Sequence, residues 1–490
     1  YGIHPVQGER LPARTRVKPA RLAALVAGGL GVGALAATAK RKLGEVLSWR
    51  SRRMWKMTAR NAGRYAGTRA RRIITPAERR AELDTQFAIR TAEDVAKELG
   101  EMKGVMMKVG QMVSFIAEGL PEEAQQALAA LQADAAPMAP SLAASVIRSE
   151  LGRDPERIFA SWEDIPVAAA SIGQVHRATD SQGRQLAVKV QFPGVSEAIE
   201  EDLDAAEVMY AVFSMLALNG LDARALVDEL RARMREELDY RREAANITEF
   251  AERFAGHPWV RIPTLAPEFS TGKVLTTEWV DGMSWAGFVA HASGPTKQLA
   301  AEVIWRFAQY SVHRVGAFNG DPHPGNYRFH HDGSVTFLDF GLVKRWDSGE
   351  WQRLEPTLDA IVVDRDPDKL VGAMEAAGFL VPDHGLAPER VYDYVSTPYR
   401  PYLVDEFTFT RDWMRDTLGR IVDLAGPHAD VISKLNMPAS FVILDRVVWG
   451  VSAILGKLGA TGPWRQMLLE YRTGAAPATE LGAAELSWRP

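Results

Sequence analysis

The chain has 490 residues, of which 47% are apolar and 24% charged, and this is ordinary usage for two or three globular domains or for one two-lobed enzyme with extensions. It has no cysteine, which excludes disulfides, thiolate catalysis and zinc–thiolate sites. The net charge of −4 conceals an asymmetry, because residues 1–80 hold 19 basic and three acidic side chains and carry +16, whereas the remainder carries −20. A basic arm on an acidic body favours an anionic partner, either a lipid surface or nucleic acid.

Within the basic arm, residues 22–39 form an uncharged run, LAALVAGGLGVGALAATA. Its 18 residues are at the lower limit for a bilayer span, and Gly29 and Gly33 form a GxxxG pair that permits close helix packing. A signal peptide, a flexible Ala/Gly linker and a membrane-embedded or membrane-lying segment are the three interpretations. Trp49, Trp55 and the many arginines that follow favour the membrane segment slightly.

The next part of the chain is predicted to be helical. Residues 41–75 predict a basic helix with Trp and Met interleaved, and residues 76–131 have apolar side chains at helical spacing with few breakers. The stretch DAAPMAP, residues 134–140, predicts a loop. Ser141 is expected to cap a helix that ends at Leu151.

From Ile165 to Gln191 the pattern changes to two extended runs around the turn 181–183, which predicts a β-hairpin whose second strand is LAVKVQF. Helix returns over residues 194–254, and VRIPTL and GKVLTTEWVDG then predict two further strands. Beyond Gly287 the chain is mostly helical. Few strands early and many helices late indicate an α+β chain with a small mixed lobe and a larger helical lobe.

One segment interrupts the late helices: FNGDPHPGNYRFHHDGSVTFLDFG, residues 318–341. Its runs YRFH and SVTFLDF, joined by an Asp-Gly turn, predict a hairpin that brings Asn326 and Asp339 together. Two oxygen ligands at one point suit a hard cation such as Mg2+. Asp321 stands five residues before Asn326, and this order, followed by Asp-Phe-Gly, is that of the catalytic and metal loops of protein kinases, although Asp-Phe-Gly alone is a weak signal.

Lys189 lies among apolar side chains on the strand LAVKV, where burying an unpaired ammonium is costly. The kinase interpretation supplies nucleotide phosphates and a helix glutamate as partners, and the alternative is a snorkelling lysine on an edge strand. The stretch REELDYRREAANITEF carries Glu237, Asp239 and Glu243. Glu237 and Asp239 fall on different helical faces, whereas Glu243 shares a face with Asp239. By itself this stretch predicts a solvated helix face.

Two further stretches are weak alone. MMKVGQMVS contains Lys108, Gly110 and Gln111 and by itself predicts core packing. VAAASIGQVH contains four small side chains that allow backbone N–H groups to approach phosphates closely, in a loop stiffer than a glycine-rich one. These four residues are Ala168, Ala169, Ala170 and Ser171.

Together these motifs resemble the ABC1/ADCK/UbiB (AarF-like) atypical kinase family over about residues 95–460. The family's KxGQ motif matches residues 108–111, its alanine-rich loop residues 168–171, its strand lysine Lys189, its ExD motif residues 237–239 and the following glutamate Glu243. Its catalytic and metal motifs match DPHPGN, residues 321–326, and residues 339–341. One departure is Asn319-Gly320, where the family often has His-Ala; these residues are not ligands, so the chemistry is expected to be unchanged.

The resemblance implies an α+β, protein-kinase-like two-lobed fold with an N-terminal helical KxGQ extension and a mostly helical C-lobe. The expected divisions are a basic arm 1–80 with the possible membrane segment 22–39, the KxGQ extension 81–150, an N-lobe with a helical insert 151–281, a C-lobe 282–470 and a tail 471–490.

The resemblance also implies roles for single residues. Lys189 would hold the α- and β-phosphates of ATP, Glu243 would orient Lys189, and Asp321 would act as the general base. Asn326 and Asp339 would hold Mg2+, and the alanine-rich loop would cover the nucleotide. Glu278 to Val280 would form the hinge that meets adenine. Lys108 and Gln111 would gate the site against Glu237 and Asp239.

The function implied is that of an atypical kinase or ATPase that uses Mg-ATP in support of membrane lipid metabolism, with isoprenoid quinone biosynthesis as the expected setting. The alternative is an ATP-binding regulatory or chaperone-like protein with little turnover that acts on lipids or partner enzymes. A conventional protein kinase is disfavoured by the KxGQ motif and the alanine-rich loop, and nucleic acid is a weaker partner than lipid because no reading module accompanies the basic arm. The expected location is the cytoplasmic face of a membrane, peripheral or single-span through residues 22–39, since a cleaved signal peptide would place the kinase-like body away from ATP.

Overall fold

The computed structural model describes residues 138–170, 172–197, 235, 237–422, 426–436 and 439–488. The basic arm, its apolar run 22–39 and the KxGQ motif lie outside these ranges. All described residues belong to one compact unit, Lys56–Pro490. Within the described residues, no helix has the length and hydropathy needed to cross a membrane.

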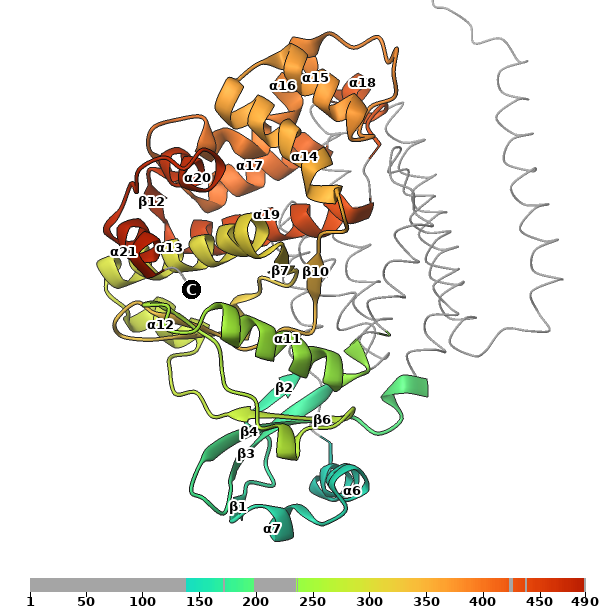
Figure 1. The fold of residues 1–490 in the computed structure, drawn as a ribbon, viewed down its shortest axis with the longest axis vertical. Helices are drawn as coiled ribbons and strands as arrows, with labels where there is room; N and C mark the ends of the chain where they lie inside the picture. Colours follow the sequence, from blue (N-terminus) through green and yellow to red (C-terminus); the bar gives the residue numbers. More distant parts are fainter. Residues whose placement is uncertain are drawn as a thin grey trace, which may run out of the picture. The chain divides into compact units, whose positions relative to one another are not determined.

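The smaller lobe is built on a five-stranded sheet in the order β1-β3-β4-β6, with β2 paired to the other end of β3 (Figure 1). The predicted hairpin is β3 and β4, which pair along their whole length from Gly173–Gln191 to Thr179–Gln185. The strands are β1 Ser161–Trp162, β2 Ala168–Ala170, β3 Gly173–Thr179, β4 Gln185–Gln191 and β6 Val274–Glu278.

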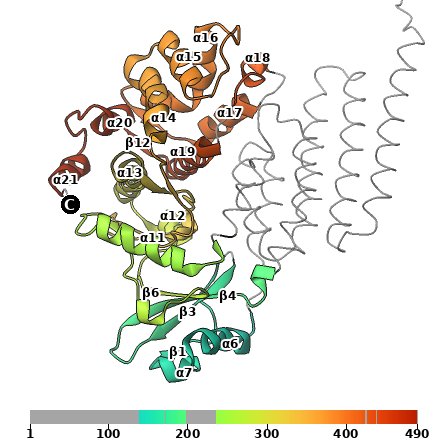
Figure 2. The same ribbon diagram turned by 45° about the vertical axis from the view of Figure 1, so that its right-hand side comes forward.

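Two helices flank this sheet, α6 Pro140–Leu151 and α7 Pro155–Ile158. The buried face of α6, which includes Ala143 and Ile147, packs against Val188 of β4 and Val274 of β6 in one apolar cluster (Figure 2). The expected boundary between the KxGQ extension and the N-lobe, at residues 150 and 151, therefore falls at the end of α6, a helix that shares its apolar core with the sheet. The predicted cap Ser141 was wrong, because Pro140 begins the helix and Ala139 takes the N-cap position without a side-chain hydrogen bond.

The conspicuous IGQVH stretch has a structural role. Gln174 and His176 are buried on β3, where Gln174 Oε1 accepts from Met138 N and Gln174 Nε2 lies 2.8 Å from His176 Nε2. His176 Nδ1 in turn lies 2.8 Å from Glu163 O. These bonds tie Met138, just before α6, and Glu163, just after β1, to the sheet.

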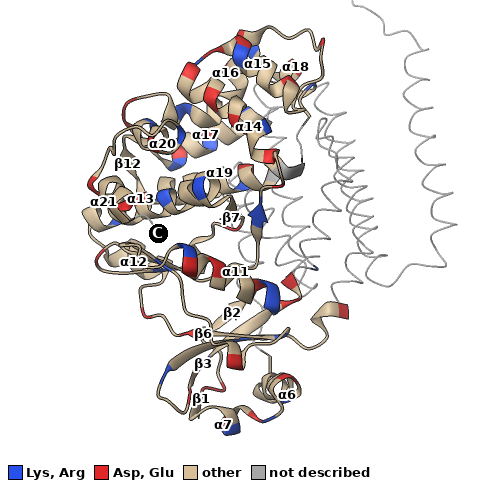
Figure 3. Cartoon of the chain, viewed as in Figure 1, with Lys and Arg blue, Asp and Glu red and all other residues tan. Residues whose placement is uncertain are grey.

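Helix α11, Tyr240–Arg253, lies between the five-stranded sheet and the larger lobe and carries charges of both signs along its length (Figures 1 and 3). It contacts β6 on one side, and on the other its Phe250 packs on Phe307 of α13 and on Phe340. Phe307 stacks on Phe337 of β9 with ring centroids 3.8 Å apart. This aromatic column joins the two lobes beside the Asp-Phe-Gly motif.

The larger lobe is mostly helical, as predicted, and the hairpin that interrupts it is β8 and β9. Two strand pairs were not predicted, β7 with β10 and β11 with β12, because each strand has only two or three residues. The lobe's strands are β5 Val260–Arg261, β7 Ala317–Asn319, β8 Tyr327–Phe329, β9 Val335–Phe337, β10 Val343–Arg345, β11 Phe407–Thr408 and β12 Thr461–Gly462.

The helices of the larger lobe follow in chain order. Ser284 and Ser293 cap the first two with their side chains, as the sequence pattern of Ser before a helix favours. The α-helices are α12 Trp285–His291, α13 Gly294–Tyr310, α14 Glu350–Asp359, α15 Pro367–Ala376, α16 Pro388–Val395, α17 Arg411–Val422, α18 Ala429–Ile432, α19 Ala439–Leu458, α20 Trp464–Arg472 and α21 Glu480–Trp488. The shorter turns are η1 Pro267–Phe269, η2 Ser311–Val315, η3 Pro324–Asn326, η4 Ala360–Asp364 and η5 Thr397–Tyr402.

The expected tail, residues 471–490, includes an ordered helix. Trp488 at the end of α21 packs on Phe254 and His257, and its indole donates to Ala255 O. Nearby, the buried guanidinium of Arg306 binds the carboxylates of Glu302, Glu470 and Glu485. Gly482 makes room for that guanidinium, since a Cβ there would lie 2.4 Å from Arg306 Nη2. Helix α21 is thus held to α13 by the Arg306–Glu485 ion pair and to the segment after α11 by aromatic contacts.

Candidate active site

Lys189 of β4 and Glu243 of α11 form a buried ion pair. Lys189 Nζ lies 3.0 and 2.9 Å from the two carboxylate oxygens of Glu243, and 3.6 Å from Asp339 Oδ2. Only 15% of the Lys189 side chain is exposed, and β4 lies between β3 and β6, so the snorkelling edge-strand interpretation was wrong. Three residues that are far apart in the sequence therefore meet at one ammonium group.

The charges around Lys189 keep it protonated. Burial alone would lower the pKa of Lys189, but the carboxylates of Glu243 and Asp339 raise it well above the ordinary lysine value. The two carboxylates of Glu243 and Asp339 against the one ammonium of Lys189 leave this cluster with a net negative charge. Additional cationic charge, such as a divalent metal ion, would restore the balance when a polyanion binds there.

One face of α11 supplies several of the contacts. Glu243 faces Lys189, Asn246 Nδ2 donates to Phe340 O at 2.8 Å, and Phe250 packs on the Phe340 ring. The spacing of three and four residues places all three on the same side of the helix. The expectation that Asp239 shares this helical face was wrong, because Asp239 is the N-cap of α11 and accepts from Arg241 N at 3.1 Å.

The β8–β9 hairpin brings Asn326 and Asp339 to the same end, as the Asp-Gly turn predicted. Leu338 N donates to Asn326 O at 2.9 Å, so Asp339 follows directly after the residue paired with Asn326. In the described ranges no three His, Asp or Glu side chains form a cluster suited to a metal ion. Mg2+ commonly takes one or two protein oxygens plus substrate phosphates and water, so these two side chains fit Mg-nucleotide better than a metal ion alone.

Asn319 links the two loops. Its buried side chain accepts from Asp321 N at 2.8 Å and donates to Asp339 O at 2.6 Å. The chain departs from the family pattern at this position, and no sequence signal assigned Asn319 a role. The structure makes it a positioning residue for both Asp321 and Asp339.

Helix α19 packs directly on the Asp321 loop. Arg446 Nη2 hydrogen-bonds Asp321 Oδ1, and only 14% and 10% of the two side chains are exposed. On either side of this pair, a Cβ on Gly450 would lie 2.5 Å from Pro322 Cγ, and a Cβ on Gly320 would lie 2.9 Å from Ile443 Cγ2. Ile443, Arg446 and Gly450 share one face of α19, so this face fixes the loop in place.

The alanine-rich stretch and the expected hinge both border the sheet. Ala168–Ala170 form β2 and pair with β3, with Ala170 opposite Gly173. The hinge prediction falls at the end of β6, where Glu278 Oε1 accepts from Thr264 N and Trp279 N donates to Gln185 O. Val280 follows, partly buried, and its N–H donates to no backbone oxygen of the described residues.

The expected gating contact is only partly within the described ranges. Lys108 and Gln111 lie outside them, as does Ser171. Glu237 is 8% exposed and Asp239 caps α11. The gating role of these four residues stays a prediction.

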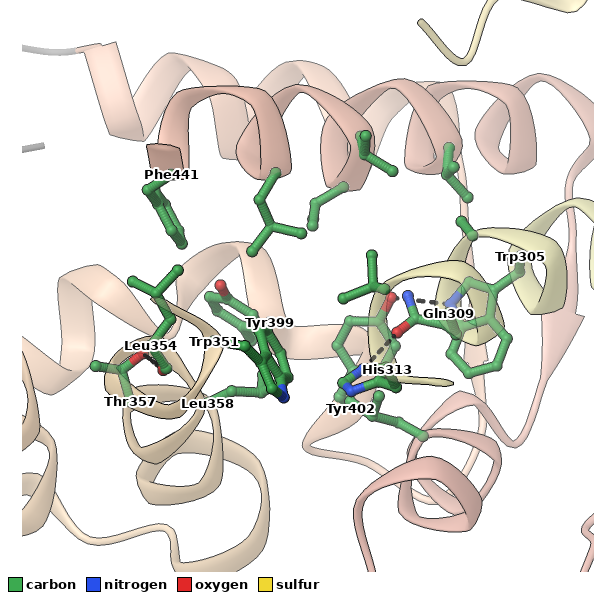
Figure 4. A pocket seen from close by; sticks show the side chains of 17 residues that line it. Trp305, Gln309, His313, Trp351, Leu354, Thr357, Leu358, Tyr399, Tyr402 and Phe441 are labelled. Carbon is green, nitrogen blue, oxygen red and sulfur yellow. Dashed lines mark hydrogen bonds between the residues drawn. The ribbon is translucent and has the colours of Figure 1, made fainter. Parts of the chain in front are cut away.

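A cavity lies elsewhere in the larger lobe, between α13, α14, η5 and α19 (Figure 4). Its lining is mostly aromatic and aliphatic, and none of Lys189, Glu243 and Asp339 borders it. The polar atoms of Gln309 and His313 pair within it, with His313 Nε2 3.1 Å from Gln309 Oε1. Leu444, Val447, Val448 and Val451 line it from α19, the helix whose other face holds Asp321.

Four residues of the site were missed from sequence. Asn246 follows Glu243 by three positions, so the helical period could have placed it on the same face. Tyr240 precedes Glu243 by the same interval. The departure at Asn319 marked its position without giving its role, and no sequence signal identifies Arg446, which lies 125 residues from Asp321.

Comparison with known proteins agrees with this geometry. The family model of the ABC1 atypical kinase-like domain matches residues 130–374. Among curated relatives, the Arabidopsis thaliana chloroplastic protein ACTIVITY OF BC1 COMPLEX KINASE 1 is 33% identical over 58% of this chain and 42% of its own length. The mitochondrial atypical kinase COQ8 of Saccharomyces cerevisiae is 31% identical over 51% of this chain and 50% of its own. The chain spans about half the length of the curated relatives it matches.

Among solved structures, the complex of Rv3197 with erythromycin from Mycobacterium tuberculosis matches with a TM-score of 0.59 at 33% identity, over 80% of this chain and 97% of that one. The family model spans half of the chain, and the same kinase-like fold holds the lysine, glutamate, aspartate and asparagine of the matching motifs. The chain belongs to the ABC1 atypical kinase-like family.

Proposed function

We propose that this protein binds Mg-ATP at the Lys189–Glu243 pair and hydrolyses it, or transfers its terminal phosphate, in support of membrane lipid metabolism. The observation that carries the proposal is the meeting of Lys189, Glu243 and Asp339 beside the hairpin that ends at Asn326. A kinase-like site needs a lysine for the phosphates, a glutamate that orients it and oxygen ligands for the metal. Lys189, Glu243 and the oxygens of Asn326 and Asp339 are side chains of these kinds, and this supports the proposal.

In this proposal, Lys189 neutralises the α- and β-phosphates and Glu243 keeps it in position. Asn326 and Asp339 hold Mg2+, which would neutralise charge on the transferring phosphate. Asp321 accepts the proton of the attacking water or hydroxyl. The residues from Glu278 to Val280 meet adenine through backbone groups, and the β2–β3 hairpin of alanines covers the phosphates. Lys108 and Gln111 gate the site together with Glu237 and Asp239.

The membrane part of the proposal rests on the sequence and on the family. The arm of residues 1–80 carries +16, which attracts anionic lipid headgroups. Family resemblance adds isoprenoid quinone biosynthesis as the pathway, with a lipid or a partner enzyme of lipid metabolism as the partner. The protein would then work at the cytoplasmic face of a membrane, held there peripherally or by residues 22–39.

The test is ADP release by the full chain with Mg-ATP, with and without anionic liposomes. We expect turnover that rises with anionic but not with neutral liposomes, because the arm binds negative headgroups. Asp339→Asn should abolish both turnover and Mg-dependent nucleotide binding by calorimetry, since it removes a metal ligand. Asp412→Asn, an exposed carboxylate on α17, is the matched control and should behave as wild type. Unchanged Mg-nucleotide affinity in Asp339→Asn would contradict the assignment of the metal site.

A second candidate is an ATP-binding switch with little turnover that binds an apolar ligand or a partner enzyme. Two observations favour it: Arg446 occupies Oδ1 of the proposed base, and the same helix lines the apolar cavity. Rv3197 was solved as a complex with erythromycin, which supports binding of a small molecule other than nucleotide by this chain as well. Tight Mg-dependent ATP binding without measurable ADP release, with turnover appearing in Arg446→Gln, would favour this switch over the ATPase.

A further inference from the structure

Tyr240 begins α11, three residues before Glu243, and is 1% exposed. Its hydroxyl reaches the start of β3, where the backbone of Gly173 passes close to it. A Cβ on Gly173 would lie 2.9 Å from the Tyr240 hydroxyl oxygen and 2.3 Å from Val190 O. Only glycine therefore leaves room for the tyrosine at the end of β3 where Gly173 pairs with Ala170 of β2.

The Tyr240 hydroxyl has no hydrogen-bond partner among the described residues, although it is buried. The carboxylate of Glu243, on the same helical face, has both oxygens within 3.0 Å of Lys189 Nζ. Lys189 Nζ itself lies 5.1 Å from the centre of the Tyr240 ring. A buried hydroxyl without a partner is costly, so it marks a place where a ligand or water can complete the bond.

The hydroxyl is a donor at neutral pH. Burial raises the pKa of Tyr240 above its ordinary value. The nearby Lys189 lowers this pKa, and the carboxylates of Glu243 and Asp339 offset part of that lowering. A protonated hydroxyl can donate as well as accept, so a hydrogen-bond acceptor that enters this place can satisfy it. An acceptor at this place also lies beside the Lys189 ammonium and the backbone of Gly173, which suits a phosphate oxygen.

We propose that the Tyr240 hydroxyl donates a hydrogen bond to a phosphate oxygen of the nucleotide, on the phosphate that Lys189 neutralises. Tyr240 thereby becomes a phosphate-binding residue that none of the matched kinase motifs includes. The inference rests on the proposed nucleotide site. It predicts that the bond exists only in the nucleotide complex, so the hydroxyl contributes to nucleotide affinity and not to the stability of the free protein.

The test is the variant Tyr240→Phe, which removes the hydroxyl and keeps the ring over which Lys189 lies. Calorimetry should show Mg-ADP and Mg-ATP binding weakened roughly tenfold, because a hydrogen bond to a charged phosphate is lost. Binding of adenosine, which has no phosphate, should be unchanged. The thermal unfolding midpoint of the nucleotide-free variant should equal or exceed that of wild type, because no hydrogen bond to the described residues is broken.

Tyr394→Phe is the matched control. Tyr394 is also buried, but its hydroxyl donates to Ile421 O at 2.9 Å, so its loss should lower the unfolding midpoint and leave nucleotide affinity unchanged. An unchanged affinity for Mg-ADP in Tyr240→Phe overturns the inference, and so does a loss of midpoint as large as that of Tyr394→Phe. Wild-type protein that binds no Mg-nucleotide contradicts the proposed function itself, which separates the two failures.

Discussion

At the scale of single residues, the site depends on side chains that hold others in place. Lys189 is oriented by Glu243, Asp321 by Arg446, and both Asp321 and Asp339 by Asn319. Each of these contacts is mostly buried, where an unpaired polar group is costly. The chemistry of the proposed site is therefore fixed as much by these positioning residues as by the residues that would contact nucleotide.

Replacing Asn319 by alanine should affect both stability and turnover. The variant leaves Asp321 N and Asp339 O without their side-chain partner, which should lower the free energy of unfolding by roughly 2–4 kcal/mol. Because both loops loosen, ATP turnover should fall by about a hundredfold. Chemical denaturation and steady-state ADP release measure the two effects.

The control for Asn319 is Asn436→Ala, which removes an exposed hydrogen bond to Gly378 O. It should change the free energy of unfolding by well under about 1 kcal/mol and leave turnover intact. Turnover at the wild-type rate in Asn319→Ala would show that the two loops keep their positions without this side chain.

At the scale of elements, the contact between α19 and the Asp321 loop depends on glycine. Gly450 has no space for a Cβ, because Pro322 Cγ would lie 2.5 Å away. The ring of Pro322 is rigid and cannot move aside as a flexible side chain would. The loop and the helix therefore fit only at this backbone distance.

We expect Gly450→Ala to push α19 away from the loop and to separate Arg446 from Asp321. Overpacking of this kind costs about 1–3 kcal/mol, and turnover should fall with it. Gly372→Ala is the matched control, because Gly372 lies on the exposed side of α15 with nothing within 4 Å of its Cβ position. The control should raise the free energy of unfolding by roughly 0.5–1 kcal/mol, since alanine is the better helix former. Equal effects of the two substitutions in urea unfolding would contradict the tight contact at Pro322.

At the scale of the whole described unit, the C-terminal helix closes over a histidine. His257 Nδ1 accepts from Trp259 N and Val260 N, and Trp488 of α21 covers its ring. Burial, together with the charge of Arg306, lowers the pKa of His257 to about 4. The ring is thus held neutral in the folded protein.

This neutral histidine should make stability depend on pH. In the unfolded chain the pKa of histidine is about 6.5, so between pH 6.5 and pH 4 the unfolded state binds more protons than the folded state. The stability that the neutral His257 contributes is fully present above pH 6.5 and is lost as the pH falls through this window. At pH 5 the loss in free energy of unfolding amounts to about 2 kcal/mol.

The variant His257→Asn keeps an acceptor for the backbone N–H groups but cannot titrate. Between pH 7 and pH 5, the free energy of unfolding of this variant should therefore fall less than that of wild type. The difference between the two decreases should be about 2 kcal/mol. Urea unfolding at several pH values checks this, and parallel pH curves for the two proteins would contradict it.

The sequence determined the features that depend on neighbouring residues. Asp332-Gly333 and Ser181–Gly183 specify tight turns, so both hairpins, and with them the meeting of Asn326 and Asp339, followed from local patterns. An ammonium on an otherwise apolar strand favoured an anionic partner, and the family resemblance named Glu243 as the residue that orients it. The motif order was sufficient to predict the family and the fold class, which the family model and the solved relative confirm.

Only the tertiary structure decided the contacts between distant segments. Arg446 reaches Asp321 across 125 residues and Trp488 reaches Ala255 across 233, and no local period relates such positions. The role of Asp239 as a cap depended on where α11 begins, and helix ends are set by tertiary packing as well as by propensity. Asn319 became a link between two loops only because β7 and β10 pair beside them. A side chain that positions another one contacts it across the folded structure, and the residues next to it in the sequence do not indicate which distant residue it will contact.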